Sequence, residues 1–214
     1  MDVLGELHRA GAVSLGRHFV YRSGNHGEGY INPDAIFPDV ALLSQLCDLL
    51  VAPFDEVDTT VGPATGGIVL SVLAALSLRH RGRGAAAVWA DKDDGDFVFQ
   101  RAGFVEHLAG RRVLVVEDLL TTGGSVERVC RQAERHGARL VGVSAICNRG
   151  DVTADQLGVP RLEALVDVDF QAFAPDRCEL CAAAVPIVED VGHGDRYKAM
   201  HPEYPGGYTT LSAA

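Results

Sequence analysis

VLVVEDLLTTGGSV, the stretch from Val113 to Val126, decides the fold that this sequence predicts. Its first four residues form an apolar run bounded by charge, which is typical of a strand buried on both faces of a parallel sheet. Glu117 and Asp118 follow at the carboxyl end of that strand, where open α/β sheets bind their ligands. The next residues, VERVCRQAERHGA, form an amphipathic pattern that ends at Gly137. The stretch therefore predicts a strand, a polar turn and a helix.

The polar turn TTGGS has the features of a phosphate-binding loop. Its two glycines let backbone N–H groups approach an anion, its hydroxyls add donors, and the helix N-terminus favours negative charge. The two carboxylates before the turn cannot bind that phosphate, because they need hydroxyls or a cation as partners. The expected ligand carries a phosphate and a polyol and comes with Mg²⁺, as a phosphorylated ribose does. The residues of this predicted site are Glu117, Asp118, Thr121, Thr122, Gly123, Gly124 and Ser125.

The same stretch resembles the phosphoribosyl-pyrophosphate signature of the type I phosphoribosyltransferases. In that family the acidic pair holds the ribose hydroxyls and the following turn holds the 5-phosphate. The resemblance therefore assigns Glu117 and Asp118 to ribose, and Thr121 to Ser125 to phosphate. The alternative is an ordinary strand–turn–helix junction, which a TTGGS turn alone would favour. The acidic pair after a hydrophobic strand argues against it.

Length, charge and cysteine usage exclude several classes of protein. The chain has 214 residues, enough for one α/β domain with a small appendage. A net charge of −10 without a basic stripe argues against nucleic acid as the main partner. No apolar run is long enough to span a bilayer, and the N-terminus MDVLGELHRAGAV lacks a secretion signal. Five scattered cysteines suit a reducing compartment, so we expect a cytoplasmic protein with no membrane partner.

Predicted strands alternate with predicted helices along most of the chain. This order favours an α/β fold, a parallel sheet flanked by helices as in the type I phosphoribosyltransferases. We expect one domain over residues 1–214, with a small N-terminal hood at about 1–34 and 165–190 and an irregular tail at about 174–214. Helices are predicted at Val3–Ala12 and from Pro38 to about Pro53, short hood strands at His18–Arg22 and Tyr30–Asn32, and a last helix–strand unit from about Asp151 to Asp167.

A second glycine-rich loop, GPATGG, spans Gly62–Gly67. Glycines that merely ease a tight turn are the simpler interpretation. The loop follows a strand and lies one βαβ unit before the signature, where it resembles the pyrophosphate-binding loop of the same family. The resemblance assigns Ala64, Thr65, Gly66 and Gly67 to the substrate. Several orotate members of the family carry a lysine in this loop, but the matching residue here is Gly66, so only backbone N–H groups can bind the anion.

The segment RSGNHGEGYIN, Arg22–Asn32, resembles the hood of the orotate phosphoribosyltransferases. In that group a basic residue before Ser-Gly and an aromatic residue shortly before Asn border the base. The resemblance therefore assigns Arg22 and Tyr30 to base binding. Taken singly, Arg22 could be a solvated charge at a strand end and Tyr30 a core aromatic residue.

Two further cationic residues take roles from the same resemblance. Arg149 ends a buried strand at the ligand edge, where the family places an arginine that grips the base carboxylate; the alternative is an exposed loop arginine. Many relatives have a basic loop that reaches into the active site of a dimer partner. The matching segment, Ala90–Phe104, has Lys92 among four aspartates. The resemblance makes Lys92 a catalytic residue together with Asp118, and implies a homodimer.

Cys178 and Cys181 form a C-x-x-C pair in RCELCAAAVPI. A single pair is a weak zinc signal, although His193 and His201 could complete a site. We favour two thiols in a packed turn, with no metal. A similar segment occurs near the C-terminus of one bacterial group of orotate phosphoribosyltransferases.

The resemblance as a whole implies an enzyme that transfers the phosphoribosyl group of phosphoribosyl pyrophosphate to orotate, with Mg²⁺. Orotidine 5-phosphate and pyrophosphate are the implied products. Two alternatives stay open: a phosphoribosyltransferase for a different base, and a non-catalytic regulatory protein that binds phosphoribosyl pyrophosphate. A DNA-binding regulator of this fold would need an added basic domain, and the sequence has none.

Overall fold

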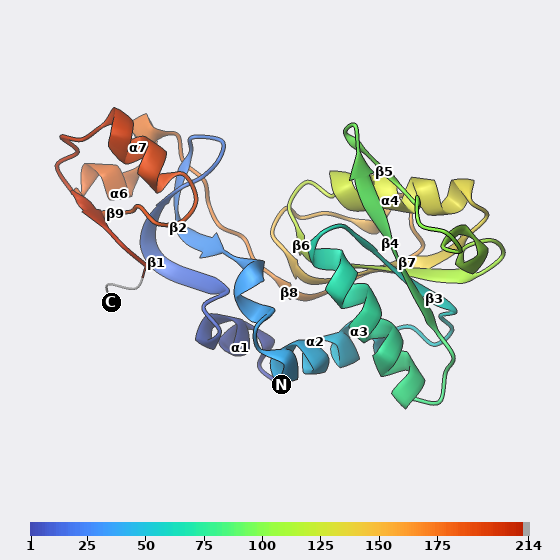
Figure 1. Ribbon diagram of the computed structural model, residues 1–214. Coiled ribbons are helices and arrows are strands. Elements are labelled where there is room, and N and C mark those ends of the chain that lie inside the picture. Colours follow the sequence, from blue (N-terminus) through green and yellow to red (C-terminus); the bar gives the residue numbers. More distant parts are fainter. Residues whose placement is uncertain (212–214) are drawn as a thin grey trace. The chain divides into compact units, whose positions relative to one another are not determined.

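The computed structural model describes residues 1–211, which divide into two compact units (Figure 1). The core unit comprises Met1–Val3 and Ile36–Asp169. The hood unit comprises Leu4–Ala35 and the described residues from Phe170 onward. From the sequence, the second segment of the hood was predicted at about residues 165–190, and an irregular tail at about 174–214. In the structure this segment begins at Phe170 and includes the tail.

Within the described residues, the core unit contains a six-stranded sheet of order β5-β4-β3-β6-β7-β8. Its strands run parallel except for β5, which pairs antiparallel with β4 at one edge. From β3 to β5 the strands are added toward one edge of the sheet, and from β6 to β8 toward the other, so the strand order reverses between β3 and β6. Open α/β sheets bind ligands beside such a reversal. The strands are β3 (Thr59–Pro63), β4 (Ala86–Asp93), β5 (Asp96–Val98), β6 (Arg112–Leu120), β7 (Arg139–Asn148) and β8 (Leu162–Asp167).

Helices cover both faces of this sheet, which explains the continuous apolar run of β6. Helix α4 (Gly124–Arg135) packs Val126, Val129 and Cys130 against one face. Helices α2 (Val40–Val51) and α3 (Gly66–His80) lie on the other face (Figure 1). Val113–Val116 are completely buried between the two layers. The predicted α/β fold with a flanked parallel sheet is confirmed.

Local capping fixes where the helices begin. Asp39 accepts a hydrogen bond from the N–H of Leu42 at 2.9 Å, so α2 starts at Val40 rather than at the predicted Pro38. Thr153 and Gln156 form a reciprocal capping box at the start of the short helix α5 (Ala154–Leu157). The helix–strand unit predicted between Asp151 and Asp167 is therefore α5 followed by β8.

The hood unit, as far as it is described, has a four-stranded sheet of order β10-β9-β1-β2. Strands β1 (Val13–Val20) and β2 (His26–Ile31) form an antiparallel hairpin. The predicted strand at His18–Arg22 was too short and too late, because the pairing shifts between Leu15 and Phe19 and so interrupts the alternation along β1. The remaining elements are α1 (Val3–Arg9), η1 (Pro33–Ile36, which ends in the core unit), η3 (Pro175–Arg177), α6 (Glu179–Ala182), β9 (Ile187–Val188), α7 (Gly194–Met200) and β10 (Tyr208–Thr209).

The tail after Ala174 is more ordered than its sequence predicts, and the expectation of an irregular segment is corrected. Strand β9 pairs in parallel with β1 and with β10. Tyr197 and Tyr204 pack edge to face, with ring centroids 6.2 Å apart. Elements of two to seven residues are too short to show a periodic pattern in the sequence. They can be identified only from their contacts with segments that are distant in the sequence.

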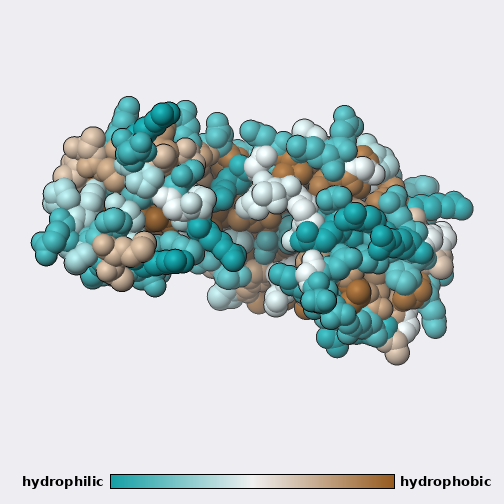
Figure 2. Space-filling view, turned by 90° about the horizontal axis from the view of Figure 1, so that it is seen from above, coloured by the Kyte–Doolittle hydropathy of each residue, from teal (hydrophilic) through white to brown (hydrophobic). Residues whose placement is uncertain are grey.

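No helix among the described residues is long and apolar enough to cross a membrane. The face shown in Figure 2 is mostly hydrophilic, with apolar residues in separate patches.

Candidate active site

Three loops that carry predicted site residues leave the same edge of the core sheet. Strands β3, β6 and β7 are parallel neighbours, so their carboxyl ends lie together. The glycine-rich loop follows β3, Glu117 and Asp118 lie on β6 just before the phosphate turn, and Arg149 follows β7. Because β3 and β6 are the strands at which the order reverses, the two predicted anion loops flank the reversal.

Gly66 brings the two anion loops into contact. A Cβ atom at Gly66 would lie 2.2 Å from Oδ2 of Asp118, so the missing side chain leaves room for this carboxylate. At Gly67, a Cβ would lie 2.8 Å from Cα of Gly62, where the helix start packs against its own strand. The two glycines therefore have different structural roles. Gly66 leaves room for the carboxylate of Asp118, and Gly67 lets the start of α3 pack closely against β3.

The helices that begin at these loops lack side-chain caps. Thr65 and Gly123 hold the cap positions of α3 and α4, and neither makes a side-chain cap hydrogen bond. N–H groups of a first helical turn have no partner inside the helix, and the helix dipole favours an anion there. The N–H of Ala64, however, donates to the carbonyl of Ala90 at 2.9 Å. The N–H of Ala64 is therefore already engaged, so the donors considered for an anion begin at Thr65, and the predicted substrate-binding role of Ala64 stays a prediction.

The two acidic residues occupy different environments. Glu117 is buried, and its Oε1 accepts a hydrogen bond from the N–H of Asp118 at 3.1 Å. Burial raises the pKa of Glu117 well above its usual value of 4.5, and the charge of Asp118 raises it further. Asp118 is half-buried and is thus the more accessible of the two carboxylates.

The phosphate turn encloses a small pocket of about 60 Å³, lined by Glu117 and Leu119–Val126. Gly123 adopts a left-handed conformation with φ of 73°. A Cβ atom there would lie 2.9 Å from both Cγ1 of Val152 and Cδ2 of Leu157. Both the backbone angle and the close packing therefore require glycine at this position.

The loop after β7 supports the phosphate turn, a role that our sequence analysis missed. Asn148 exchanges two hydrogen bonds of 3.1 Å with the backbone of Val152. A Cβ atom at Gly150 would lie 1.4 Å from the carbonyl oxygen of Thr121, so this backbone lies directly against the turn. The N–H of Arg149 donates to the carbonyl of Leu120 at 2.8 Å. The turn signal Asn-Arg-Gly at a strand end is the local feature that could have identified this support.

The remaining predicted residues lie elsewhere. Lys92 is exposed on β4, in the hairpin that β4 forms with β5. Arg22 and Tyr30 belong to the hood unit, where Arg22 lines a pocket of about 350 Å³ and Tyr30 lines another of about 410 Å³. Tyr30 also stacks on Phe19, with ring centroids 5.4 Å apart. The structure thus gathers the core residues at one edge, and the roles of Lys92, Arg22 and Tyr30 stay predictions.

Comparison with known proteins identifies the family. Residues 41–171 match the model of the phosphoribosyl transferase domain. The chain is 37% identical over 191 residues to the orotate phosphoribosyltransferase of Thermus thermophilus. This alignment covers 88% of this chain and 100% of the relative. The chain belongs to the phosphoribosyl transferase family. A second member of that family, the orotate phosphoribosyltransferase of Thermotoga maritima, is 34% identical, with 88% of this chain and 96% of the relative covered.

Solved phosphoribosyltransferase structures share the fold. The orotate phosphoribosyltransferase of Aeropyrum pernix superposes with a TM-score of 0.58 at 25% identity, over 77% of this chain and 94% of that one. The enzyme of Francisella tularensis gives 0.61 at 16% identity, over 95% and 99%. An adenine phosphoribosyltransferase of Saccharomyces cerevisiae gives 0.58 at 21% identity, over 77% and 99%. The predicted family is confirmed, and the last match shows that the fold alone does not choose the base.

Proposed function

We propose that this protein joins orotate to the phosphoribosyl group of phosphoribosyl pyrophosphate, giving orotidine 5-phosphate and pyrophosphate. The observation that carries the proposal is the sheet edge at which two uncapped helix N-termini flank an acidic pair. The names of the curated relatives support orotate as the base.

The donor's groups match the chemistry of the sheet edge. The 5-phosphate suits the turn Thr121–Ser125 and the start of α4, and the ribose hydroxyls suit Asp118 and Glu117. The pyrophosphate suits the N–H groups of Thr65–Gly67 at the start of α3. Because Gly66 lies against Asp118, these groups would lie side by side, as they do in the donor.

The reaction is a displacement at the anomeric carbon of ribose. The bond from this carbon to the pyrophosphate oxygen breaks, its electron pair leaves with pyrophosphate, and a ring nitrogen of orotate forms the new bond. Positive charge develops on the ribose, as in other glycosyl transfers. The loops hold the reactants in line, and the N-terminus of α3 stabilises the charge that develops on the leaving group. Lys92 would add a cation at this stage.

The residues at the sheet edge fit Mg²⁺. Carboxylates and hydroxyls are the hard oxygen ligands that this ion takes. In the described part of the chain, no group of three metal-binding side chains gathers there. Glu117 and Asp118 would therefore hold Mg²⁺ together with the donor's own oxygens, which is usual for this ion. At this position the two carboxylates would hold an ion whose charge would offset that of the departing pyrophosphate.

Selection of orotate requires a cation, because orotate differs from uracil by one carboxylate. Arg149 has its backbone fixed beside the phosphate turn, and its guanidinium suits a planar carboxylate. The roles of Arg22 and Tyr30 in base binding stay predictions from the resemblance. The proposal also includes a cytoplasmic homodimer in which Lys92 serves the partner's site.

Turnover measured by the loss of orotate absorbance tests this function. In Arg149→Ala we expect kcat/KM for orotate to fall about ten- to a hundredfold, the equivalent of one charge-assisted hydrogen bond, with unchanged donor affinity. Arg149→Lys should recover little of the loss. Arg139→Ala is the matched control, because Arg139 is exposed at the opposite end of β7. Equal use of uracil or a purine would refute orotate as the base, and tight donor binding without turnover would favour the regulatory alternative.

A further inference from the structure

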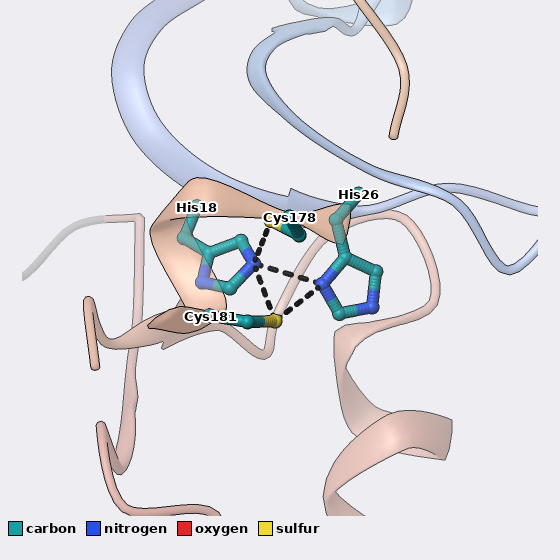
Figure 3. Close-up of side chains that lie close together, drawn as sticks. All are labelled: His18, His26, Cys178 and Cys181. Carbon is teal, nitrogen blue, oxygen red and sulfur yellow. Dashed lines mark hydrogen bonds between the residues drawn. The ribbon is translucent and has the colours of Figure 1, made fainter. Parts of the chain in front are cut away.

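Four side chains with metal-binding atoms converge inside the hood unit (Figure 3). His18 comes from β1, His26 from β2 and Cys181 from α6, and Cys178 is the residue between η3 and α6. One ligand atom from each lies within 4.8 Å of all the others. Three of the residues are buried and Cys181 is partly buried. All four belong to one compact unit.

The distances between these atoms are close to those of a tetrahedral zinc site, with the nitrogen–nitrogen pair somewhat shorter. Nε2 of His18 lies 2.9 Å from Nδ1 of His26. Sγ of Cys178 lies 3.6 Å from Nε2 of His18, and Sγ of Cys181 lies 3.7 Å from it and 3.2 Å from Nδ1 of His26. Zinc bonds of about 2.1 Å to nitrogen and about 2.3 Å to sulfur at tetrahedral angles put two nitrogens about 3.4 Å apart, and nitrogen and sulfur about 3.6 Å apart.

Hydrogen bonding outside the cluster orients the His18 ring as a ligand. Nδ1 of His18 lies 2.9 Å from the carbonyl oxygen of Val185. A carbonyl only accepts, so Nδ1 carries the proton and Nε2 presents its lone pair to the cluster. Zinc-binding histidines are held in this way by a partner on the far nitrogen. Nε2 of the buried His26 ring has no hydrogen-bond partner within the described structure. The hydrogen bonds of this ring are made by Nδ1, to His18 and Cys181 of the cluster.

We infer that His18, His26, Cys178 and Cys181 bind one Zn²⁺ ion in a closed structural site. Two imidazoles and two thiolates in tetrahedral array are a zinc ligand set. The protein fills all four positions and leaves none for a substrate, so the ion would be structural rather than catalytic. This inference replaces the metal-free pair favoured from the sequence, and it takes His18 and His26 in place of His193 and His201.

The ion would fasten the C-terminal segment to the N-terminal hairpin. His18 and Cys178 are 160 residues apart in the sequence. Among the described residues, the β-pairing that joins these segments is short: one register pair, His18 with Ile187, and one isolated bridge, His26 with Phe173. Both segments lie outside residues 41–171, which match the family domain. A unit with so small a core needs a further constraint, and metal binding supplies free energy of folding.

Metal content tests the inference directly. The full chain, produced in zinc-supplemented medium and dialysed, should contain one zinc per chain by elemental analysis. Replacing zinc with Co²⁺ should give the intense visible bands of a tetrahedral site and a thiolate charge-transfer band. Cys178→Ser/Cys181→Ser should lose the metal. Cys130→Ala should keep it, because Cys130 is a buried cysteine of α4 in the core unit.

Two results would overturn the site. One is a folded wild-type protein with substoichiometric zinc and no tetrahedral Co²⁺ spectrum. The other is full zinc content in the double cysteine variant, which would place the ion elsewhere. Both wild-type measurements are independent of variant folding and of catalytic activity.

Discussion

At the scale of single residues, the absence of a side chain at Gly66 leaves room for the carboxylate of Asp118 in the proposed donor site. Gly66→Ala would push a methyl group against the carboxylate of Asp118, which must then leave its position. We expect affinity for phosphoribosyl pyrophosphate, measured by calorimetry with Mg²⁺, to fall about tenfold or more, the value of a charge-assisted hydrogen bond. Gly84→Ala is the matched control, because no atom lies within 4 Å of a Cβ there. Unchanged affinity in Gly66→Ala would remove this contact from the donor site.

Glu117 is expected to lower the stability of the empty core unit at neutral pH. Its folded pKa is raised, so its contribution to stability is greatest below the usual value of 4.5 and is lost as pH rises through the folded pKa. Glu117→Gln does not ionise. We expect the variant to gain stability over wild type as pH rises from pH 5 to pH 8, because only the wild-type side chain must ionise in a buried position.

Urea unfolding without ligand at the two pH values measures this gain. The fluorescence of Trp89, the single tryptophan, reports on the core unit because it lies on β4. Glu106→Gln is the control, since Glu106 is exposed. A stability difference that does not change with pH would contradict the raised pKa. Donor affinity should fall in Glu117→Gln, so that stability and binding change in opposite directions.

Residue chemistry could be predicted where the partners are close in sequence. Glu117, Asp118 and the following turn lie within one strand–turn–helix unit, which the structure confirms, and their pattern predicts an anion and a polyol site. The contact of Gly66 with Asp118 joins two loops far apart in the sequence, and the pairing of Cys178 with His18 joins the two ends of the chain. Such contacts depend on topology, which residue types alone do not specify.

At the scale of elements, the same distinction separates the core from the hood. Strand β6 has a continuous apolar run and α4 has an amphipathic pattern, so both could be identified from periodicity. Strands β9 and β10 have two residues each, too few for any pattern. Strand β9 forms because β1 offers it a pairing edge, and β10 forms because β9 does. The sequence around the two strands gives no sign of these partners.

Helix α3 presents apolar residues on both of its faces. Leu70, Ala74 and Leu78 are buried. On the other side Val69, Val72 and Leu76 remain 43–46% exposed, at spacings of three and four residues. The outer face of α4, in contrast, carries charges such as the ion pair of Glu127 and Arg131. An apolar stripe of this kind marks an interaction surface, and a second copy of the chain is the partner in our proposal.

Val72→Asp should therefore turn the dimer into a monomer, because it places an unpaired charge in the middle of the stripe. Sedimentation velocity measures the change in mass. Val40→Asp is the control, because Val40 is 65% exposed at the start of α2 and lies outside the stripe. A dimer that persists in Val72→Asp would exclude this surface of α3 as its interface.

At the scale of the whole molecule, the hood unit is built from both ends of the sequence, and the family domain from its middle. The domain match covers residues 41–171, and the hood unit comprises Leu4–Ala35 and the described residues from Phe170 onward. The core could be predicted because it follows the βα alternation of the family. The hood could not be predicted in full, because the contacts that hold it join segments at opposite ends of the sequence.

The proposed dimer has a consequence for how active sites are completed. If Lys92 serves the partner's site, an Asp118→Asn chain paired with a Lys92→Ala chain leaves one intact site per mixed dimer. Each variant alone should be nearly inactive, because every site then lacks either the ribose-binding carboxylate or the cation. Random exchange makes half of the dimers mixed, so the mixture should recover about a quarter of the wild-type rate. The rate of orotate consumption after subunit exchange measures this, with mixed dimers verified by differently tagged chains. Absence of recovery in verified mixed dimers would show that Lys92 does not act across the interface.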